Sequence, residues 1–293
     1  MSKILLVRLS AAVIVAMGAW IAYTQTPQAP PQLTIDKLKD DLYVIMGDGG
    51  NVAVYVTDEG VILIDDKFER DYGDIMAKVK SVTAKPVKYV LNTHHHGDHT
   101  GGNAKMTDAS AQIISHRNAR ANMVAQKMPG LSQVTFSDET QVFLGGKEVR
   151  AHYFGRGHTN GDVMIYFPAL KVLHTGDLFT VASPPSPNPN AIAPFIDFAG
   201  GGSVVEWTKT LDNLMKQGWD FDTVIPGHGP VSKPADLISY RQKFEKMRTR
   251  MSGVVKGGKS KDEVVKTLAS DFGWAPDGNG MRQVDAFIAE LKR

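Results

Sequence analysis

The sequence of 293 residues contains no cysteine. No disulfide can therefore stabilise the fold, and no thiolate can act as a nucleophile or as a metal ligand. Any metal site in this chain has to be built from nitrogen and oxygen ligands alone. Low-complexity segments and internal repeats are also missing, which excludes a repeat architecture.

An excess of charge of either sign is lacking as well. The chain has 33 Lys and Arg against 31 Asp and Glu, and residues 1–26 carry two basic residues and no acid, so the remainder is balanced at 31 against 31. A neutral folded part gives no electrostatic basis for nucleic-acid binding, which depends on clustered Lys and Arg. The one basic run, 241–250, follows a helical pattern and is interpreted as a solvated helix face. We therefore expect a small-molecule substrate and no nucleic-acid partner.

The first 26 residues have a composition of their own. They carry Lys3 and Arg8, and an apolar run extends from Leu9 to Tyr23. This arrangement is typical of a secretory signal peptide. A clear cleavage site of small residues is missing, so an uncleaved anchor with a membrane tether through residues 4–23 is the alternative. Both arrangements place the folded part outside the cytoplasm, as a periplasmic or secreted protein.

The hydrophobic pattern after residue 32 predicts an α/β protein in which pairs of strands alternate with helices. The predicted strands cover residues 42–47, 51–57, 60–66, 87–92, 111–116, a hairpin at 140–154, 162–168, 171–177 and a segment that begins at 222. The predicted helices cover residues 69–82, 117–128, 203–218, 234–251 and two short segments near 261–270 and 281–291. We expect a Pro-rich linker at 27–32, one domain at 33–250, and a helical extension at 251–293 that packs on it.

The stretch NTHHHGDHTGG at residues 92–102 contains four of the nine histidines. His94, His96, Asp98 and His99 form the pattern H-x-H-x-D-H directly after the predicted strand 87–92. Rigid scaffolds present catalytic side chains where strands end. Imidazole and carboxylate together suit zinc. A solvated histidine loop is the alternative, but the spacing after a buried strand favours a metal site.

Three further ligand-type residues stand at strand ends beside glycine. They are His158 in GRGHTNGD, Asp177 in LHTGDLF and His228 in IPGHGP. Glycine allows the backbone to approach an ion or a substrate closely. Taken singly, each residue also fits a cap or a turn. Their order after the H-x-H-x-D-H motif indicates that all belong to one site.

With these motifs the sequence resembles the metallo-β-lactamase-fold hydrolases over residues 33–245. The resemblance implies a four-layer αββα sandwich, and the ligand pattern is most similar to that of glyoxalase II and the lactonases. It also implies two Zn²⁺ per chain. The first zinc would be bound by His94, His96 and His158, the second by Asp98, His99 and His228, and Asp177 would bridge the two. Residues 61–68, 193–203 and 224–230 resemble those of exported bacterial members.

The activity implied by the resemblance is hydrolysis. A hydroxide that bridges the two ions would attack the carbonyl of a small ester, lactone, thioester or amide, and Asp98 would be the catalytic residue that orients it. A β-lactamase is the alternative, although β-lactamases of the family usually carry another residue in place of Asp177, in some a cysteine. A mononuclear iron oxidoreductase similar to persulfide dioxygenases is an alternative of another class. A metal-binding protein without chemistry is the third.

Other histidines and one aspartate have expected supporting roles. Asp65, at the end of the predicted strand 60–66, is expected to hydrogen-bond the ligand loop and so orient it, with a plain turn residue as the alternative. His95 should point away from the metals because its neighbours point toward them. His116, His152 and His174 are interpreted as structural.

Two loops are placed to form the walls of a substrate cleft, residues 47–51 and 181–202. Five prolines exclude regular structure from residues 181–202. Phe195, Ile196 and Phe198 in this loop suggest an apolar wall. Arg156 is the one basic residue close to the metal motifs, which gives little support for a phosphate or nucleic-acid substrate.

Overall fold

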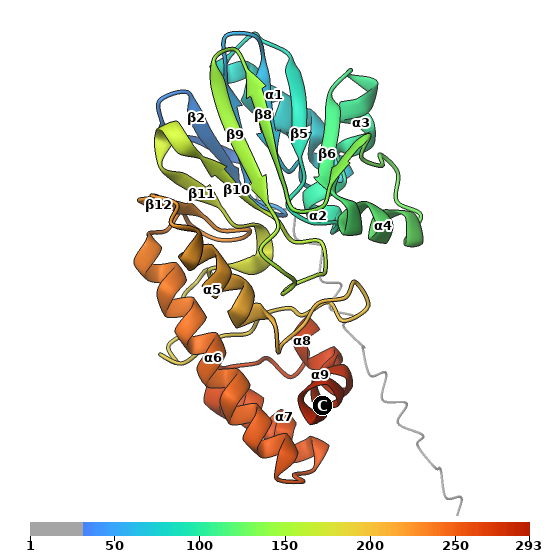
Figure 1. Cartoon of the computed structure of the whole chain (residues 1–293), viewed down its shortest axis with the longest axis vertical. Coiled ribbons are helices and arrows are strands. Elements are labelled where there is room, and N and C mark those ends of the chain that lie inside the picture. Colours follow the sequence, from blue (N-terminus) through green and yellow to red (C-terminus); the bar gives the residue numbers. More distant parts are fainter. Residues whose placement is uncertain (1–31) are drawn as a thin grey trace, which may run out of the picture. The chain divides into compact units, whose positions relative to one another are not determined.

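The computed structural model describes residues 32–293, so the leader expected at 1–26 and all of the linker except Gln32 lie outside the described residues. Two β-sheets pack face to face and helices cover the outer face of each sheet (Figure 1). This confirms the four-layer αββα sandwich. No helix within residues 32–293 is long and apolar enough to cross a membrane.

The first sheet combines antiparallel hairpins with a parallel half. Its strands are, in spatial order, β1 (Thr34–Lys39), β2 (Leu42–Met46), β3 (Val52–Val56), β4 (Val61–Ile64), β5 (Val87–Leu91), β6 (Gln112–His116) and β7 (Val134–Phe136). Pairing is antiparallel from β1 to β4 and parallel from β4 to β7. The intervening helices are η1 (Glu69–Asp71), α1 (Tyr72–Val82), α2 (Gly97–Thr100), α3 (Asn103–Asp108) and α4 (Arg117–Ala125). Because β4 and β5 run the same way, the loops after them open at one edge of the sheet.

The second sheet has the order β12-β11-β10-β9-β8. Its strands are β8 (Glu139–Leu144), β9 (Lys147–His152), β10 (Met164–Phe167), β11 (Val172–His174) and β12 (Thr223–Ile225). Its helices are η2 (Pro168–Leu170), η3 (Gly176–Leu178), α5 (Trp207–Gln217), α6 (Pro234–Lys256), α7 (Lys261–Phe272), α8 (Asn279–Arg282) and α9 (Val284–Lys292). Since β11 and β12 are parallel neighbours, the loops after them also emerge at one edge.

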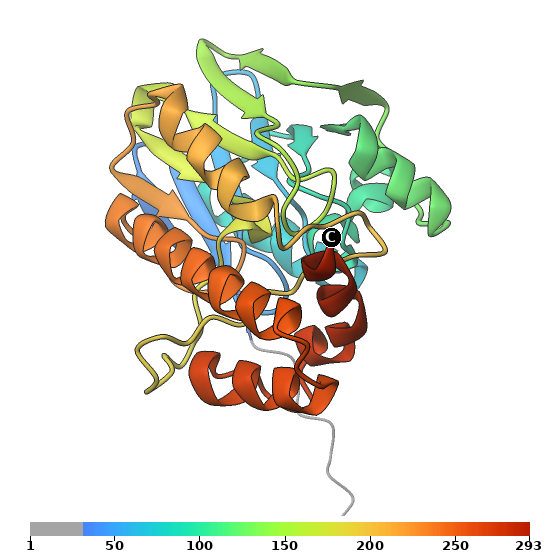
Figure 2. The ribbon, with the colours of Figure 1, turned by 60° about the horizontal axis from the view of Figure 1, so that its bottom comes forward.

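Successive side chains along a strand face two different hydrophobic cores. In β4, Ile62 and Ile64 face the core between the two sheets, whereas Val61 and Leu63 face the core under α1 and α3. A strand covered on both faces needs apolar residues at every position, which is why VILI is a continuous apolar run. Figure 2 shows α5 and α6 lying across the second sheet.

The C-terminal helices share one core with α5 and α6. Val264 and Leu268 of α7 and Phe287 of α9 belong to the same buried cluster as Trp207 of α5 and Phe244 of α6. Helix α6 runs through residue 250, where we expected the main domain to end, and that division of the chain stays a prediction.

The structure contains elements that the sequence pattern did not predict. Two short helices, α2 and α3, follow β5, and residues 100–103 join them. The Asp66 carboxylate accepts the Gly102 N–H at 2.9 Å and holds this junction. Strands β1 and β7 were also missed. Both lie at sheet edges, where backbone pairing with the neighbouring strand outweighs a weak apolar pattern.

Helix ends differ from the expected ones by a few residues. The helix expected from Ser203 begins at Trp207, because Ser203 Oγ accepts the Glu206 N–H at 3.0 Å and caps a turn that precedes it. Gly218 ends this helix with φ of 74°, as expected for a left-handed C-terminal residue.

Candidate metal centre

All seven residues predicted to bind metal lie at neighbouring strand ends. His94, His96, Asp98 and His99 follow β5, and the last two lie on α2. His158 lies in the loop between β9 and β10, Asp177 on η3 after β11, and His228 after β12. The structure groups their donor atoms in overlapping sets of three, each set within 4.8 Å. Residues up to 134 positions apart in the sequence therefore form one cluster.

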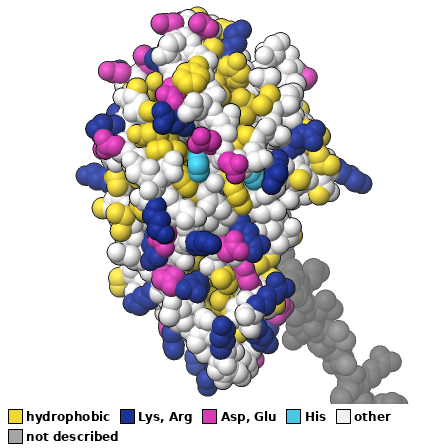
Figure 3. All heavy atoms as spheres, viewed as in Figure 1, with side chains coloured by type: hydrophobic (Ala, Val, Ile, Leu, Met, Phe, Trp, Pro, Cys, Tyr) yellow, Lys and Arg dark blue, Asp and Glu magenta, His cyan; other side chains and the backbone are white. Residues whose placement is uncertain are grey.

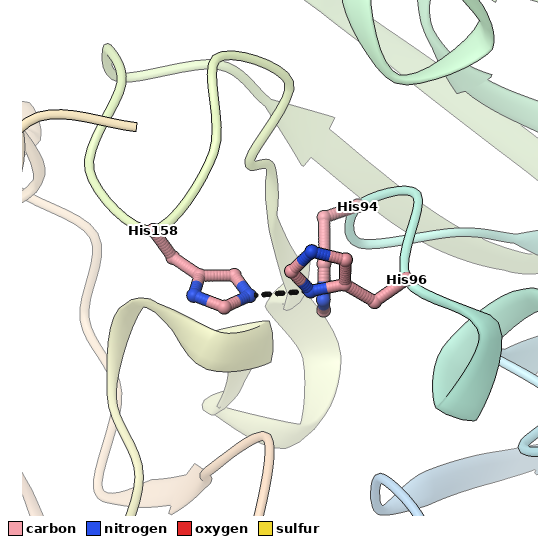
Figure 4. Close-up of side chains that lie close together, drawn as sticks. All are labelled: His94, His96 and His158. Carbon is pink, nitrogen blue, oxygen red and sulfur yellow. Dashed lines mark hydrogen bonds between the residues drawn. The ribbon is translucent and has the colours of Figure 1, made fainter. Parts of the chain in front are cut away.

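The first set is formed by His94, His96 and His158 (Figure 4). His158 Nε2 lies 2.8 Å from His96 Nδ1. His94 Nε2 is buried and has no hydrogen-bond partner among the described residues. A buried polar atom without a partner is costly, and a bound cation would satisfy it.

Each histidine of the first set donates its other ring N–H to a fixed acceptor. His94 Nδ1 donates to Thr93 Oγ1 at 3.0 Å, and His158 Nδ1 donates to the Phe195 carbonyl at 2.7 Å. His96 Nε2 donates to Asp197 Oδ2 at 3.0 Å. These bonds fix the tautomers, so the three nitrogens that face one another carry lone pairs. Three convergent lone pairs form a set that could hold a metal ion.

The second set contains Asp98, His99 and His228, with Asp177 between the sets. His228 Nε2 lies 3.2 Å from Asp98 Oδ2 and 3.4 Å from Asp177 Oδ2, and His99 Nε2 lies 3.2 Å from Asp177 Oδ1. Asp177 Oδ2 is also 3.5 Å from His158 Nε2 of the first set. Asp177 therefore touches both sets, as a bridging ligand would.

Asp65 orients residues of both sets and fulfils the supporting role expected for it. Its Oδ2 accepts the His99 Nδ1–H at 2.7 Å and the Thr93 hydroxyl at 2.7 Å. Because the Thr93 hydroxyl donates to Asp65, its oxygen is free to accept from His94. One fully buried carboxylate thus fixes the tautomer of His99 directly and that of His94 through Thr93.

Burial and nearby charges shift the pKa values of histidines in the two sets in opposite directions. Burial lowers the pKa of His158 to about 4 and that of His94 well below its usual range, so both rings are neutral at pH 7. Burial also acts on His228, but the Asp177 and Asp98 carboxylates outweigh it and raise the pKa of His228 to about 9. The same balance raises the pKa of His99. The carboxylates therefore favour the protonated form of His99 and His228.

The chemistry of the donors fits zinc. Five imidazoles and two carboxylates surround the cluster, and imidazole with carboxylate is a ligand set that zinc accepts when no thiolate is present. Burial would raise the pKa of Asp98, but His99 and His228 lower it to about 2, so this carboxylate is ionised at pH 7.

Comparison with known proteins identifies the family. The family model described as "Metallo-beta-lactamase superfamily" matches residues 45–251, which is more than half of the chain. The chain belongs to this superfamily. All seven of the clustered residues lie within the matched range.

Relatives and solved structures agree with this assignment. A metallo-beta-lactamase type 2 of Elizabethkingia meningoseptica is 28% identical over 232 residues, covering 74% of this chain and 89% of that protein. A metallo-beta-lactamase type 2 of Bacillus cereus is 26% identical over 193 residues, covering 64% of this chain and 70% of that protein. The structure of a metallo-beta-lactamase from Pontibacter korlensis superposes with a TM-score of 0.64 at 22% identity, covering 73% of this chain and 99% of that one. This structural likeness shows the shared fold.

Two glycines let the metallo-β-lactamase-fold loops come together at the cluster. A Cβ on Gly50 would collide with the His99 ring, and a Cβ on Gly227 would collide with the Asp177 carboxylate. Gly227 precedes His228, so the absence of its side chain lets the His228 loop approach Asp177.

Sequence reasoning missed Asp197. This residue lies in the Pro-rich loop, its Oδ2 accepts the His96 Nε2–H at 3.0 Å, and it lies 3.5 Å from His95 Nε2. Burial would raise the pKa of Asp197, but the bonds to His95, His96 and the Gly200 N–H lower it. The signal was present in the sequence, because Asp197 is the single acid in the apolar stretch APFIDFAG of a loop expected at the site.

Lys67 was also missed, and it holds the loop at residues 47–51. Its fully buried Nζ donates to the Asp48 carbonyl at 2.8 Å and to the Gly50 carbonyl at 2.6 Å. Burial lowers the pKa of Lys67 to about 8. The Gly50 N–H in turn donates to the Asp98 carbonyl at 3.0 Å. Lys67 thereby fixes this loop against the ligand-bearing segment.

The expected apolar wall is largely wrong. Ile196 is buried in the core of the second sheet, and Phe198 packs against the same core. Because the loop folds back onto that core, the two side chains pack there and not toward the site. Of the three apolar residues, Phe195 lies beside the site, with its ring centroid 5.7 Å from those of His96 and His158.

Charged groups near the site are mostly acidic. Arg156 is paired with Glu206 at 2.8 Å. On the face shown in Figure 3, Lys or Arg and Asp or Glu side chains are interspersed. An acidic, histidine-rich site attracts a cation more readily than a phosphate.

The remaining histidines make contacts that fit structural roles. His116 Nε2 donates to the Ser137 carbonyl at 2.7 Å, and His174 Nε2 donates to the Asn51 carbonyl at 3.1 Å. His152 Nδ1 lies 3.2 Å from Glu139. The His95 ring points toward the side chains of Asn122 in α4 and of Gln126 at the end of that helix. Of the seven predicted ligands, His96 is the one grouped with His95, and the ring faces away from the other six.

Zinc binding to the metal-free protein is expected to release at least one proton per chain at pH 7. The pKa of His228 is about 9, so its ring holds a proton at pH 7 that a metal must displace, and the raised pKa of His99 adds to the release. The affinity for the second ion should therefore rise with pH until about pH 9. Calorimetric zinc titrations in buffers of different ionisation enthalpy measure the release. A titration without proton release would contradict this protonation of the second set.

Asp197→Ala is expected to weaken zinc binding at the first set by roughly 10- to 100-fold, the usual cost of losing a partner of a ligating histidine. Without the carboxylate, His96 is free to change tautomer and to rotate. Competition with a chromophoric chelator measures the affinity. Asp197→Asn keeps one acceptor oxygen and should retain more of it. Equal zinc affinity in all three proteins would show that Asp197 does not position His96.

Proposed function

We propose that this protein is a dinuclear zinc hydrolase that acts on the carbonyl of a small ester, lactone, thioester or amide. His94, His96 and His158 would hold the first zinc, Asp98, His99 and His228 the second, and Asp177 would bridge them. One observation carries the proposal. The inward ring nitrogens of the histidines and the Asp177 carboxylate gather in overlapping sets, while the opposite ring nitrogens of four histidines are held by fixed partners.

The residues supply the remaining parts of a hydrolytic mechanism. Two zinc ions bound there would provide Lewis acidity toward the carbonyl and lower the pKa of a water between them. Asp98, ionised at pH 7 and partly exposed, would orient that water toward the carbonyl carbon. Phe195, beside His96 and His158, would contact an apolar part of the substrate.

A β-lactam is the second candidate substrate. It is supported by the relatives, which are named metallo-beta-lactamases. The aspartate at position 177 supports an ester or lactone instead. Both candidates share a polarised carbonyl and need no cysteine, so a direct assay has to choose between them.

The experiment is hydrolysis by the zinc-loaded protein of a chromogenic cephalosporin and of a panel of lactones, esters and thioesters. Turnover of the cephalosporin that Asp177→Ala loses would establish a β-lactamase. Turnover of a lactone or ester alone would establish the first candidate. Failure of a two-zinc protein on the whole panel would refute the proposed reaction class. Binding of one iron per chain would instead support the iron oxidoreductase.

We also propose that the protein is exported from the cytoplasm. The basic and apolar residues at 1–26 support it, and the relatives are bacterial enzymes. The substrate would then meet the enzyme in the periplasm or outside the cell.

A further inference from the structure

We infer that the C-terminal helical segment, residues 261–292, holds the loop at residues 188–204 in place, with Glu290 of α9 as the positioning residue. This loop carries the hydrogen-bond partners of His96 and His158. The inference rests on the proposed metal centre. It assigns a role in the site to residues 261–292, which follow the segment that the family model matches.

The loop provides partners for two histidines of the first set. Asp197 Oδ2 accepts the His96 Nε2–H at 3.0 Å, and the Phe195 carbonyl accepts the His158 Nδ1–H at 2.7 Å. The Asp197 N–H also donates to the His158 carbonyl at 2.9 Å. A displacement of residues 195–197 would therefore disturb His96 and His158 together.

The loop has no strand or helix of its own to fix it. Residues 181–202 contain five prolines and form turns and irregular backbone. Backbone groups in such a segment need partners from elsewhere in the fold, and those partners decide its conformation.

Helix α9 and the residue directly before it supply such partners at the end of the loop. Glu290 Oε1 accepts the Ser203 hydroxyl at 2.5 Å, and Oε2 accepts the Val204 N–H at 2.8 Å. Gln283 Oε1 accepts the Phe198 N–H at 3.3 Å. One carboxylate thus binds two consecutive residues, a geometry that fixes the chain direction as well as its position.

The end of α7 supplies partners at the start of the loop. Trp274 Nε1 donates to the Ile192 carbonyl at 2.8 Å, and the Ile192 N–H donates to the Phe272 carbonyl at 3.0 Å. Trp274 is 3% exposed and packs edge-on against Phe287 of α9, with ring centroids 5.6 Å apart. The C-terminal segment therefore holds the loop on both sides of Phe195 and Asp197.

The test compares Glu290→Ala and Glu290→Gln with the zinc-loaded full chain. Asp285→Ala is the matched control, because Asp285 lies on the same helix and its carboxylate binds the exposed Lys261 instead of the loop. Zinc affinity at the first set is measured with a chromophoric chelator, and the geometry of the site with the visible spectrum of the cobalt(II)-substituted protein. Backbone hydrogen exchange of residues 195–204 reports on the loop itself.

Glu290→Ala should weaken zinc binding by about tenfold, the lower end of the cost of losing an outer partner of a ligand. It should also alter the cobalt spectrum and speed exchange in the loop. Glu290→Gln retains one acceptor and should recover most of the affinity, and Asp285→Ala should match the unaltered protein. If Glu290→Ala does not fold, Gln283→Ala, which removes a single bond to the loop, should produce a smaller change in the same direction.

Two results would overturn the inference in distinguishable ways. An unaltered protein that binds no zinc would overturn the proposed function and this inference with it. An unaltered protein that binds two zinc ions, with Glu290→Ala and Gln283→Ala equal to it in affinity and cobalt spectrum, would overturn this inference alone. A lower melting temperature without those changes would assign Glu290 to stability only.

Discussion

Asp177→Ala is expected to lose the second zinc and to reduce kcat by more than the roughly 100-fold that loss of an outer partner costs. Asp177 lies 3.2–3.5 Å from ring nitrogens of His99, His158 and His228, so under the proposed assignment its removal would take one ligand from each of the two ions. It also leaves three histidines without the carboxylate that attracts a cation. Metal content by mass spectrometry, together with turnover on the best substrate of the panel, measures both effects.

Asp220→Ala is the matched control for this variant. Asp220 is an exposed aspartate paired with Lys171, and an exposed pair contributes little to stability. Its replacement should leave metal content and turnover unchanged. If Asp177→Ala kept two zinc ions and full turnover, the dinuclear assignment would be wrong.

Removal of metal is the second change with a large expected effect. A chelator should abolish turnover, and the free energy of unfolding should fall by about 4 kcal/mol, the stabilisation that a ligand provides at roughly 1,000 times its Kd. For a domain of this size each kcal/mol shifts Tm by about 2–4 °C, so a decrease of roughly 10 °C is expected. Differential scanning calorimetry with and without zinc measures it.

Re-addition of zinc is the control for chelation. Zinc should restore both Tm and turnover, and the restored protein should contain two zinc ions per chain. Activity that survives complete metal removal would exclude a metallohydrolase. Recovery with one iron per chain, but not with zinc, would indicate the oxidoreductase alternative.

The seven residues of the cluster could be selected before the structure was known because their signals are local. The spacing of His94, His96, Asp98 and His99 after an apolar strand is a pattern within a dozen residues. His158, Asp177 and His228 each carry the same local mark, a ligand-type side chain beside glycine at a strand end. Their roles as ligands stay predictions, but the structure brings all of them together.

The residues that position the cluster could not be selected in the same way. Asp197 is 101 residues from His96, and Glu290 is 87 residues from Ser203. Lys67 resembles an ordinary turn lysine until the fold buries it completely. Hydrogen bonds between distant segments leave no spacing in the sequence, since nothing in the local pattern records which loop lies opposite.

The strands show the same difference between what a local pattern predicts and what contacts between distant segments decide. Strands such as β4, with four buried residues in four, were predictable because burial on both faces requires a continuous apolar run. Strands β1 and β7 were not, since an edge strand is defined by backbone pairing with a neighbour. Isoleucine and phenylalanine at 196 and 198 indicated an apolar wall, and the fold placed them in its core instead.

By itself, the sequence determined the layered α/β fold, the absence of thiolate chemistry and the residues that gather at the candidate metal centre. Hydrophobic period, residue type and short spacing are properties of neighbouring residues, and they are present before the chain folds. Only the tertiary structure decided which ring nitrogens face inward, which carboxylates hold them and which helices hold the loop beside them. Those choices depend on distances between segments that are far apart along the chain, and folding alone sets these distances.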